Sequence, residues 1–188
     1  MAASQYTPTS FSNCFVMDNN LANPCPAGFK KYFATFFHTR YSMSVLLRLS
    51  QHFAEKSKKG SRVSRFVAQL CRRFNVILNT FDHPTDVQVA AGVVFHHPGV
   101  IIASGTIIEP LVHIYGNVTF GRKNGKTPHI GEAAKICGHT MIIGGVKVGK
   151  RAIVAPGAIV VHDIEARQVV AGVPAKSIGK VDEENYNF

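Results

Sequence analysis

A histidine pair and a carboxylate are the residues of this chain best suited to moving a proton. His96 and His97 interrupt a stretch rich in Val and Ile, and Asp82 lies shortly before them in the chain. Two adjacent histidines cannot both point into a core, so one side chain is expected to face outward. A carboxylate beside an imidazole fixes the tautomer and raises the basicity of the ring, as a general base requires. Asp82 and His97 are therefore the candidate catalytic pair.

A basic loop is the second candidate. Residues 121–128 read Gly-Arg-Lys-Asn-Gly-Lys-Thr-Pro, a composition typical of turns. Such a segment is either a plain surface loop or a flap whose glycine amides and cations face an anion. We favour the flap, because it interrupts the same repeat that the histidine pair interrupts.

The element that must position these residues repeats every six residues. Counting in sixes from Val94 to Val160 gives twelve positions, of which ten are Ile or Val. A period of six fits neither a lone amphipathic helix nor an alternating strand, and it predicts a parallel β-helix of short strands joined by tight corners. One turn of such a coil takes about 18 residues. The separation between Asp82 and His97 is slightly shorter than one turn, so the two would lie close together on successive turns.

The chain before the repeat is expected to be helical and basic. Apolar residues recur at three- and four-residue steps and predict helices over 29–56 and about 61–78, with a break at 57–61. Residues 1–80 carry 11 Lys and Arg against 2 acids, whereas the remainder is almost neutral. We interpret this basic region as a solvated face with some contact to a partner subunit; the alternative is loose attraction to an anionic membrane surface. No nucleic-acid-binding pattern occurs, so no nucleic acid partner is expected.

Composition limits the class of protein. Cys14, Cys25, Cys71 and Cys137 form no C-x-x-C pair, which favours reduced thiols over a disulfide framework or a zinc site. No apolar run is long enough to span a bilayer, and the first residues lack the pattern of a secretory signal, so a cytoplasmic location is expected. We divide the chain into a tail and basic helical region (1–80), a β-helix domain (81–180) and a C-terminal tail (181–188).

Several motifs resemble those of one family. The hexapeptide-repeat acyltransferases of the serine acetyltransferase-like group carry D-I-H-P-x(10)-D-H-x-x-G-I-V-I, then V-T-L-G-G, a loop ending in R-H-P-K-I-G, and finally A-G-V-P-A. This chain has Asp-His-Pro from residue 82, His-His-Pro-Gly-Val-Ile-Ile from 96, Val-Thr-Phe-Gly from 118 and Ala-Gly-Val-Pro-Ala from 171. The resemblance covers about residues 75–180. It implies a left-handed coil, a hand that general rules for β crossovers would not predict.

The resemblance also implies a reaction. Asp82 and His97 match the family's dyad, so His97 would take the proton of an acceptor hydroxyl that attacks acetyl-CoA, and Asp82 would orient His97. Amides near Gly121 would stabilise the oxyanion. The small residues Thr140 and Ala155 would let the pantetheine arm approach the backbone. The candidates for binding the phosphates of CoA are the cations Arg122, Lys150, Arg151 and Lys176. No metal is expected, and Cys137 is given no chemical role.

Two departures from the family concern the acceptor. The family's serine-binding carboxylate is His96 here, and the loop that grips the serine carboxylate reads Lys126-Thr127-Pro128. His96, Lys126 and Thr127 are therefore the candidate acceptor-binding residues. Relatives that acetylate sugar hydroxyls carry a similar H-P-x-G-I-V-I segment after a short basic helical region. The sequence thus favours O-acetylation of a sugar or surface-polysaccharide precursor, with serine O-acetylation as the alternative.

Other interpretations are weaker. A γ-carbonic-anhydrase-like metalloenzyme needs two histidines about five residues apart, and the coil histidines show no such pair. A non-catalytic scaffold would not need the Asp82–His97 spacing. We expect a homotrimer in which His97 of one chain faces the flap of another.

Overall fold

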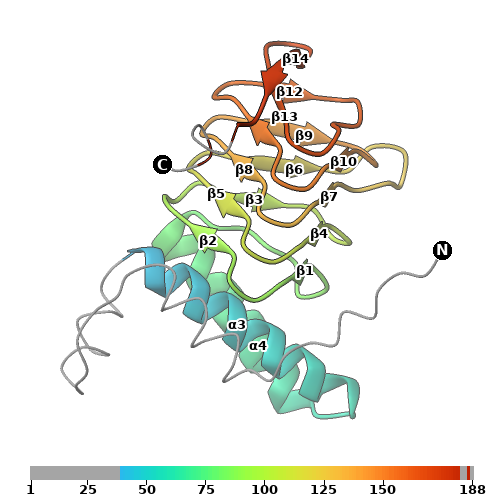
Figure 1. The fold of residues 1–188 in the computed structure, drawn as a ribbon. Helices are drawn as coiled ribbons and strands as arrows, with labels where there is room; N and C mark the ends of the chain where they lie inside the picture. Colours follow the sequence, from blue (N-terminus) through green and yellow to red (C-terminus); the bar gives the residue numbers. More distant parts are fainter. Residues whose placement is uncertain (1–38, 183–185, 187–188) are drawn as a thin grey trace.

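The structure is a coil of short strands that stands on two helices (Figure 1). It is a computed structural model, and it describes residues 39–182 and 186. The tail and residues 29–38 of the expected first helix lie outside the described residues. The elements are α3 (Thr39–Lys58), α4 (Arg62–Asn79), β1 (Gln88–Val89), β2 (Val94–Phe95), β3 (Ile101–Ile102), β4 (Ile107–Ile108), β5 (His113–Ile114), β6 (Thr119–Gly121), β7 (His129–Ile130), β8 (Lys135–Ile136), β9 (Met141–Ile143), β10 (Lys147–Val148), β11 (Ile153–Val154), β12 (Ile159–Val160), β13 (Gln168–Ala171) and β14 (Lys176–Lys180).

The strands form three sheets because, up to β12, each strand pairs with the strand three places later in the chain. The orders are β1-β4-β7-β10, β3-β6-β9-β12 and β2-β5-β8-β11-β13-β14. All pairs are parallel except β13 and β14, which are antiparallel. This arrangement is a parallel β-helix, as the six-residue repeat predicts.

The register shows where the coil departs from a regular turn. Ile101 pairs with Thr119, which stands three hexapeptides further along the chain, the regular spacing. Val94 pairs with His113, one position beyond three hexapeptides, so the corner after β2 holds an extra residue. Ile107 pairs with His129, four positions beyond the regular spacing, and the loop after β6 supplies them. Both irregularities fall where the sequence interrupts the repeat, at the histidine pair and at the basic loop.

The core fills the inside of the coil with two residues per strand. Before the basic loop the inward pairs include Val112 with Ile114 and Val118 with Phe120, and all four are fully buried. After the loop, Ala134 is buried with Ile136 in the same way. Before the loop, the residues at every sixth position are the first inward residue of each pair; after the loop, they are the second. The four inserted residues cause this change, because four is two residues short of a full hexapeptide.

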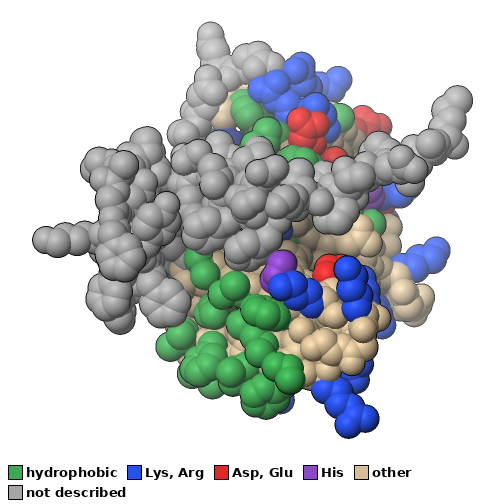
Figure 2. Space-filling view, turned by 90° about the horizontal axis from the view of Figure 1, so that it is seen from below, with side chains coloured by type: hydrophobic (Ala, Val, Ile, Leu, Met, Phe, Trp, Pro, Cys, Tyr) green, Lys and Arg blue, Asp and Glu red, His purple; other side chains and the backbone are tan. Residues whose placement is uncertain are grey.

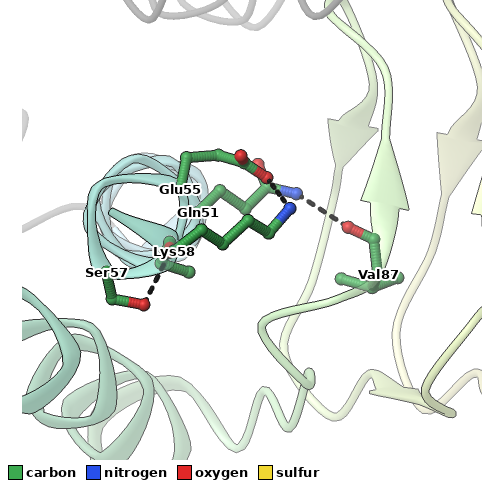
Figure 3. A network of polar contacts seen from close by, with 6 residues as sticks. Gln51, Glu55, Ser57, Lys58 and Val87 are labelled. Atoms are coloured by element: carbon green, nitrogen blue, oxygen red, sulfur yellow. Dashed lines mark hydrogen bonds and ion pairs between the residues drawn. The ribbon is translucent and has the colours of Figure 1, made fainter. Parts of the chain in front are cut away.

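The two helices confirm the expected helical region within the described residues. Ser61 caps α4, accepting a hydrogen bond from the backbone N–H of Ser64, and Thr80 ends the helix in a left-handed conformation. α3 is fixed to the first turn of the coil by Arg48, whose guanidinium donates to the carbonyls of Val89 and Ala90, each at 2.6 Å. Gln51 adds a bond of 3.1 Å to the carbonyl of Val87, as Figure 3 shows.

The apolar side of α4 faces outward. Val63, Phe66 and Ile77 are 73%, 68% and 75% exposed, whereas the buried residues of this helix are Ala68, Asn75 and Asn79. Seen from below, hydrophobic side chains gather in one patch on this face (Figure 2). The apolar stripe of α4 thus does not contribute to the core that the described residues form. Among the described helices, none is both long and apolar enough to cross a membrane.

Candidate functional site

His97 lies at the irregular corner between β2 and β3. The extra residue of this turn is accommodated between Phe95 and Val100, and the His97 side chain is exposed. A side chain at Gly116, on the turn above, would place its Cβ 2.9 Å from the Cβ of His97. Gly116 therefore makes room for the imidazole. Within the described residues the ring of His97 makes no hydrogen bond, so its nitrogens are available to a ligand.

Asp82 lies on the turn below, at the base of the sheet that begins with β3. Its backbone N–H donates to the carbonyl of Val100 at 3.0 Å, and its carbonyl accepts from Ile102 at 2.9 Å. The Asp82 carboxylate accepts two hydrogen bonds from Arg72 of α4, at 2.8 and 3.2 Å. The structure thus brings the backbones of the predicted pair to neighbouring turns. It shows no bond between the two side chains.

His96 points along the outer face of the sheet that begins with β2. Its Nε2 lies 3.0 Å from Nδ1 of His113, and its ring stacks on Tyr115 with centroids 4.4 Å apart. Burial, and next the nearby charge of Lys135, lower the pKa of His113. The residue that replaces the family's carboxylate is therefore part of an aromatic ladder directly beside His97.

A buried polar network supports the first turn from below. Asn75 donates to the carbonyl of Met43 at 3.1 Å, and its amide nitrogen lies 3.3 Å from Nε2 of His83. Asn79 donates to Asn75 at 2.8 Å and accepts from Ser42 at 2.8 Å. His83 is fully buried, its Nδ1 has no partner among the described residues, and burial lowers its pKa to about 4. Neutral His83 follows Asp82 directly, so the network fixes the backbone that carries the carboxylate.

The predicted flap is a tight hairpin. Lys123 and Lys126 exchange two backbone hydrogen bonds of 3.0 Å, and the turn residues Asn124 and Gly125 have φ values of +52° and +74°. Positive φ at both turn residues is the type I′ geometry that Asn-Gly favours. At the base of the hairpin, Thr127 donates to the carbonyl of Gly105 at 2.9 Å.

A cavity of about 500 Å³ lies beside the hairpin. The hairpin contributes Lys123, Asn124 and Lys126, and the turns above it contribute residues 143–146 and 161–163. Lys126 packs closely on Gly145, where a Cβ would lie 3.0 Å from its own. The cavity therefore combines two lysines and His162 with one carboxylate, Asp163, whose Oδ1 accepts a hydrogen bond from the backbone N–H of Lys147 at 2.8 Å. The two lysines favour an anionic ligand at the hairpin side of the cavity.

The predicted phosphate-binding cations are mostly engaged with protein groups. Arg122 donates to the carbonyl of Ser104 at 2.8 Å, and Lys150 pairs with Glu132 at 2.7 Å. The guanidinium of Arg151 lies over the ring of Tyr186, 4.3 Å from its centroid. Lys176 is exposed on β14.

The remaining predicted positions lie along the coil. Gly121 is the last residue of β6, at the start of the hairpin loop. Thr140 is fully buried, and its hydroxyl donates to the carbonyl of Cys137 at 2.7 Å, so Thr140 is part of the interior of the coil and offers no exposed atom to a ligand in this chain. Ala155 is half-buried on the turn above. Burial raises the pKa of the Cys137 thiol, although Lys135 opposes the shift. A protonated thiol is a poor nucleophile.

Sequence reasoning missed several residues of the site. The partners of the candidate residues are Arg72, His113 and Tyr115, and Lys123 and His162 line the cavity. His113 and Tyr115 follow His96 by close to one turn of the coil, a spacing that could have revealed them. No group of three potential metal-ligating side chains occurs in 39–182 or at 186.

Comparisons with known proteins agree with the resemblance drawn from the motifs. No family model matches the chain. It is 36% identical over 133 residues to serine acetyltransferase 4 of Arabidopsis thaliana, covering 68% of this chain and 37% of that relative. It is 35% identical over 133 residues to the serine acetyltransferase of Buchnera aphidicola, covering 64% and 48%. A solved serine acetyltransferase in complex with CoA has a TM-score of 0.74 at 18% identity, covering 89% of this chain and 70% of that chain.

The chain spans less than half the length of these two curated relatives. Within that span, the matched sequence confirms the resemblance drawn from the motifs, and the solved structure confirms the fold. Over about two thirds of its length the chain is similar in sequence to serine acetyltransferases, and it has the left-handed parallel β-helix of hexapeptide repeats seen in their solved structures.

Proposed function

We propose that this chain is an acetyl-CoA-dependent O-acetyltransferase with His97 as general base. The observation that carries the proposal is an exposed imidazole at the irregular corner of the coil, with Asp82 on the turn below. His97 takes the proton of an acceptor hydroxyl, and the oxygen attacks the thioester carbonyl. The tetrahedral intermediate then expels the CoA sulfur, to which the imidazolium returns the proton. Direct transfer needs no enzyme nucleophile, in keeping with the raised pKa of Cys137.

Serine is the first acceptor to test, because the curated relatives named above are serine acetyltransferases. This reverses the order expected from the sequence, which placed a sugar or polysaccharide hydroxyl first. A sugar stays the second candidate for one specific reason. His96 bonds to His113 and stacks on Tyr115, so this position offers aromatic rings, against which a sugar ring can pack, and no carboxylate for the ammonium group of serine.

The cavity beside the hairpin supports a place for the anionic end of acetyl-CoA. Lys123 and Lys126 line it, whereas Arg122, Lys150 and Arg151 have partners in the protein. We therefore assign the phosphates first to the hairpin lysines, with Lys176 as a further candidate. Gly121, at the start of the same loop, is the proposed source of an oxyanion-stabilising amide.

The proposed assembly is a homotrimer. The histidine corner joins the sheets of β2 and β3, whereas the hairpin joins the sheets of β6 and β7, so the two features lie at different corners of the coil. A site that uses both is completed when the corner of one chain meets the hairpin of another. Light scattering that shows only monomers would contradict this assembly.

Loose contact with an anionic membrane surface has less support. The outward apolar face of α4, with Arg62 and Arg65 at its start, is the observation in its favour. The names of the relatives give no support for it. Sedimentation with vesicles that contain phosphatidylserine, compared with vesicles of phosphatidylcholine alone, tests it. The cytoplasmic location likewise stays a prediction.

The decisive experiment presents the purified chain with acetyl-CoA and either L-serine or a panel of nucleotide sugars. Released CoA thiol is followed with a thiol reagent, and the acetylated product by mass spectrometry. We expect His97→Ala to lower kcat by about 10²- to 10⁴-fold, the usual contribution of a general base. His52→Ala, on α3, is the matched control. Full activity of His97→Ala would overturn the proposed role of His97.

A further inference from the structure

The ion pair between α4 and the first turn of the coil has an unusual geometry. Nε and Nη2 of Arg72 both donate to the same oxygen of Asp82, Oδ1, at 3.2 and 2.8 Å. The other oxygen, Oδ2, accepts no hydrogen bond from any described residue. Arg72 therefore fixes the rotation of the carboxylate while leaving one oxygen for another donor.

Stability alone does not account for this pair. The side chains of Arg72 and Asp82 are 34% and 47% exposed. Ion pairs that are exposed to this degree contribute at most about 1 kcal/mol, because solvent screens them. Both residues of the pair are nevertheless held in place by their surroundings, whereas an ion pair in solvent needs no such support.

At one end, the backbone of Asp82 is held by Val100 and Ile102 of the coil. At the other end, Arg72 lies one helical turn before Asn75, which donates to the carbonyl of Met43 in α3. The carboxylate is thus positioned by the coil through its main chain and by the helices through its side chain.

We infer that Arg72 is a positioning residue for acetyl transfer: it orients the Asp82 carboxylate so that Oδ2 is the oxygen that accepts from His97. The inference rests on the proposed function. The helical region then becomes part of the catalytic apparatus as well as a base for the coil. The titratable group beside the pair is His83, which is buried and neutral.

The test is a double-mutant cycle of Arg72→Gln and Asp82→Asn, with kcat and KM measured for the acceptor that the wild type uses. We expect Arg72→Gln to lower kcat about tenfold with little change in KM, since a misoriented partner weakens the base and not the binding. In the Asp82→Asn background, Arg72→Gln should have no further effect. Arg72→Lys, which keeps the charge, should retain part of the activity. Arg73→Gln, at the exposed neighbouring position, should match the wild type.

Circular dichroism and thermal melting separate this role from a loss of folding, and the variants are compared below their melting temperatures. If Arg72→Gln keeps the wild-type kcat while Asp82→Asn loses activity, the positioning role is overturned and the proposed function stands. An equal loss from Arg72→Gln in both backgrounds also overturns it, because the arginine would then act independently of Asp82. If the wild type transfers no acetyl group to serine or to any sugar, the proposed function fails, and this inference fails with it.

Discussion

Nε2 of His96 and Nδ1 of His113 lie 3.0 Å apart, and the His96 ring stacks on Tyr115 at an interplanar angle of 8°. A hydrogen bond between two imidazoles needs one donor and one acceptor, so at least one of the rings is neutral. Burial lowers the pKa of His113, which favours the neutral ring at that position. At the place where serine acetyltransferase-like motifs have a carboxylate, this chain therefore presents a fixed aromatic pair.

This pair predicts a change of acceptor preference. Replacement of His96 by Asp, as in the family motif, should raise kcat/KM for serine relative to a sugar acceptor by at least about tenfold, since a carboxylate can pair with the ammonium group of serine. Competition assays with both acceptors present measure the ratio directly. His96→Asn is the control, because it removes the imidazole without adding a charge. An unchanged ratio in His96→Asp would show that His96 does not contact the acceptor.

The buried His83 predicts a pH dependence of stability. Its pKa is lowered from 6.5 to about 4, so the folded protein disfavours protonation of the ring. Between these values the unfolded chain binds the proton and the folded chain does not, so stability is full above about pH 6.5 and falls as the pH drops toward 4. The loss should approach about 3 kcal/mol at the lower end. Urea unfolding at pH 7, 6, 5 and 4.5 measures it.

The matched variant for this effect is His83→Gln, which cannot take up the proton in this range. Its stability should be lower at pH 7 and should change less between pH 7 and 4.5 than that of the wild type. His52→Gln, on α3, provides the comparison for the loss of a histidine elsewhere. If the stability of His83→Gln falls with pH as steeply as that of the wild type, groups other than His83 cause the acid sensitivity.

The parts of the fold that the sequence could predict are those set by local pattern. The aliphatics at every sixth position are inward residues, such as Ile136 and Val154. Turn composition predicted that residues 121–128 leave the coil as an extended basic loop, and the structure shows there a tight hairpin at 123–126. The phase shift across the loop escaped prediction because a repeat of six looks the same whichever inward position it starts from. The exposed face of α4 escaped it as well, since an amphipathic stripe does not reveal whether its own chain covers it.

The candidate site was only partly predictable for a different reason. His97 and Asp82 share a recognisable spacing along the chain, whereas Arg72 reaches Asp82 from a helix whose angle to the coil no local pattern encodes. The cavity beside the hairpin likewise joins Lys123, which follows β6, to His162, which follows β12, through the stacking of turns. The full register of the coil was needed to bring such residues together.

The turn of the hairpin gives a prediction about the co-substrate. Gly125 has a φ of +74°, which β-branched residues adopt only at a cost, and a Cβ there would have open space around it. Gly125→Val should therefore distort the hairpin by backbone strain alone. We expect KM for acetyl-CoA to rise several-fold while the melting temperature stays within about 2 °C, because the hairpin lies outside the core. An unchanged KM in a variant with proven distortion would argue against the hairpin as a cofactor contact.

A close backbone approach gives a prediction about the coil itself. A Cβ at Gly149 would lie 2.4 Å from the backbone nitrogen of Ala166 on the next turn, whereas a Cβ at Gly179 would meet nothing within 4 Å. Gly149→Ala should force two turns apart and lower the melting temperature by several degrees, while Gly179→Ala should leave it unchanged. Equal melting temperatures for the two variants would mean that the upper turns of the coil accommodate the added methyl group without loss of stability.

The proposed division of the site between subunits can be tested by complementation. His97→Ala and the hairpin double variant Lys123→Glu/Lys126→Glu should each be nearly inactive alone. Co-expression with two affinity tags and tandem purification yields mixed trimers. In a closed ring of three, one interface joins an intact histidine corner to an intact hairpin, so activity should return to about one third of the wild type. Activity that stays at the level of the separate variants would mean that both features act within one chain, because no exchange of subunits could then restore a complete site.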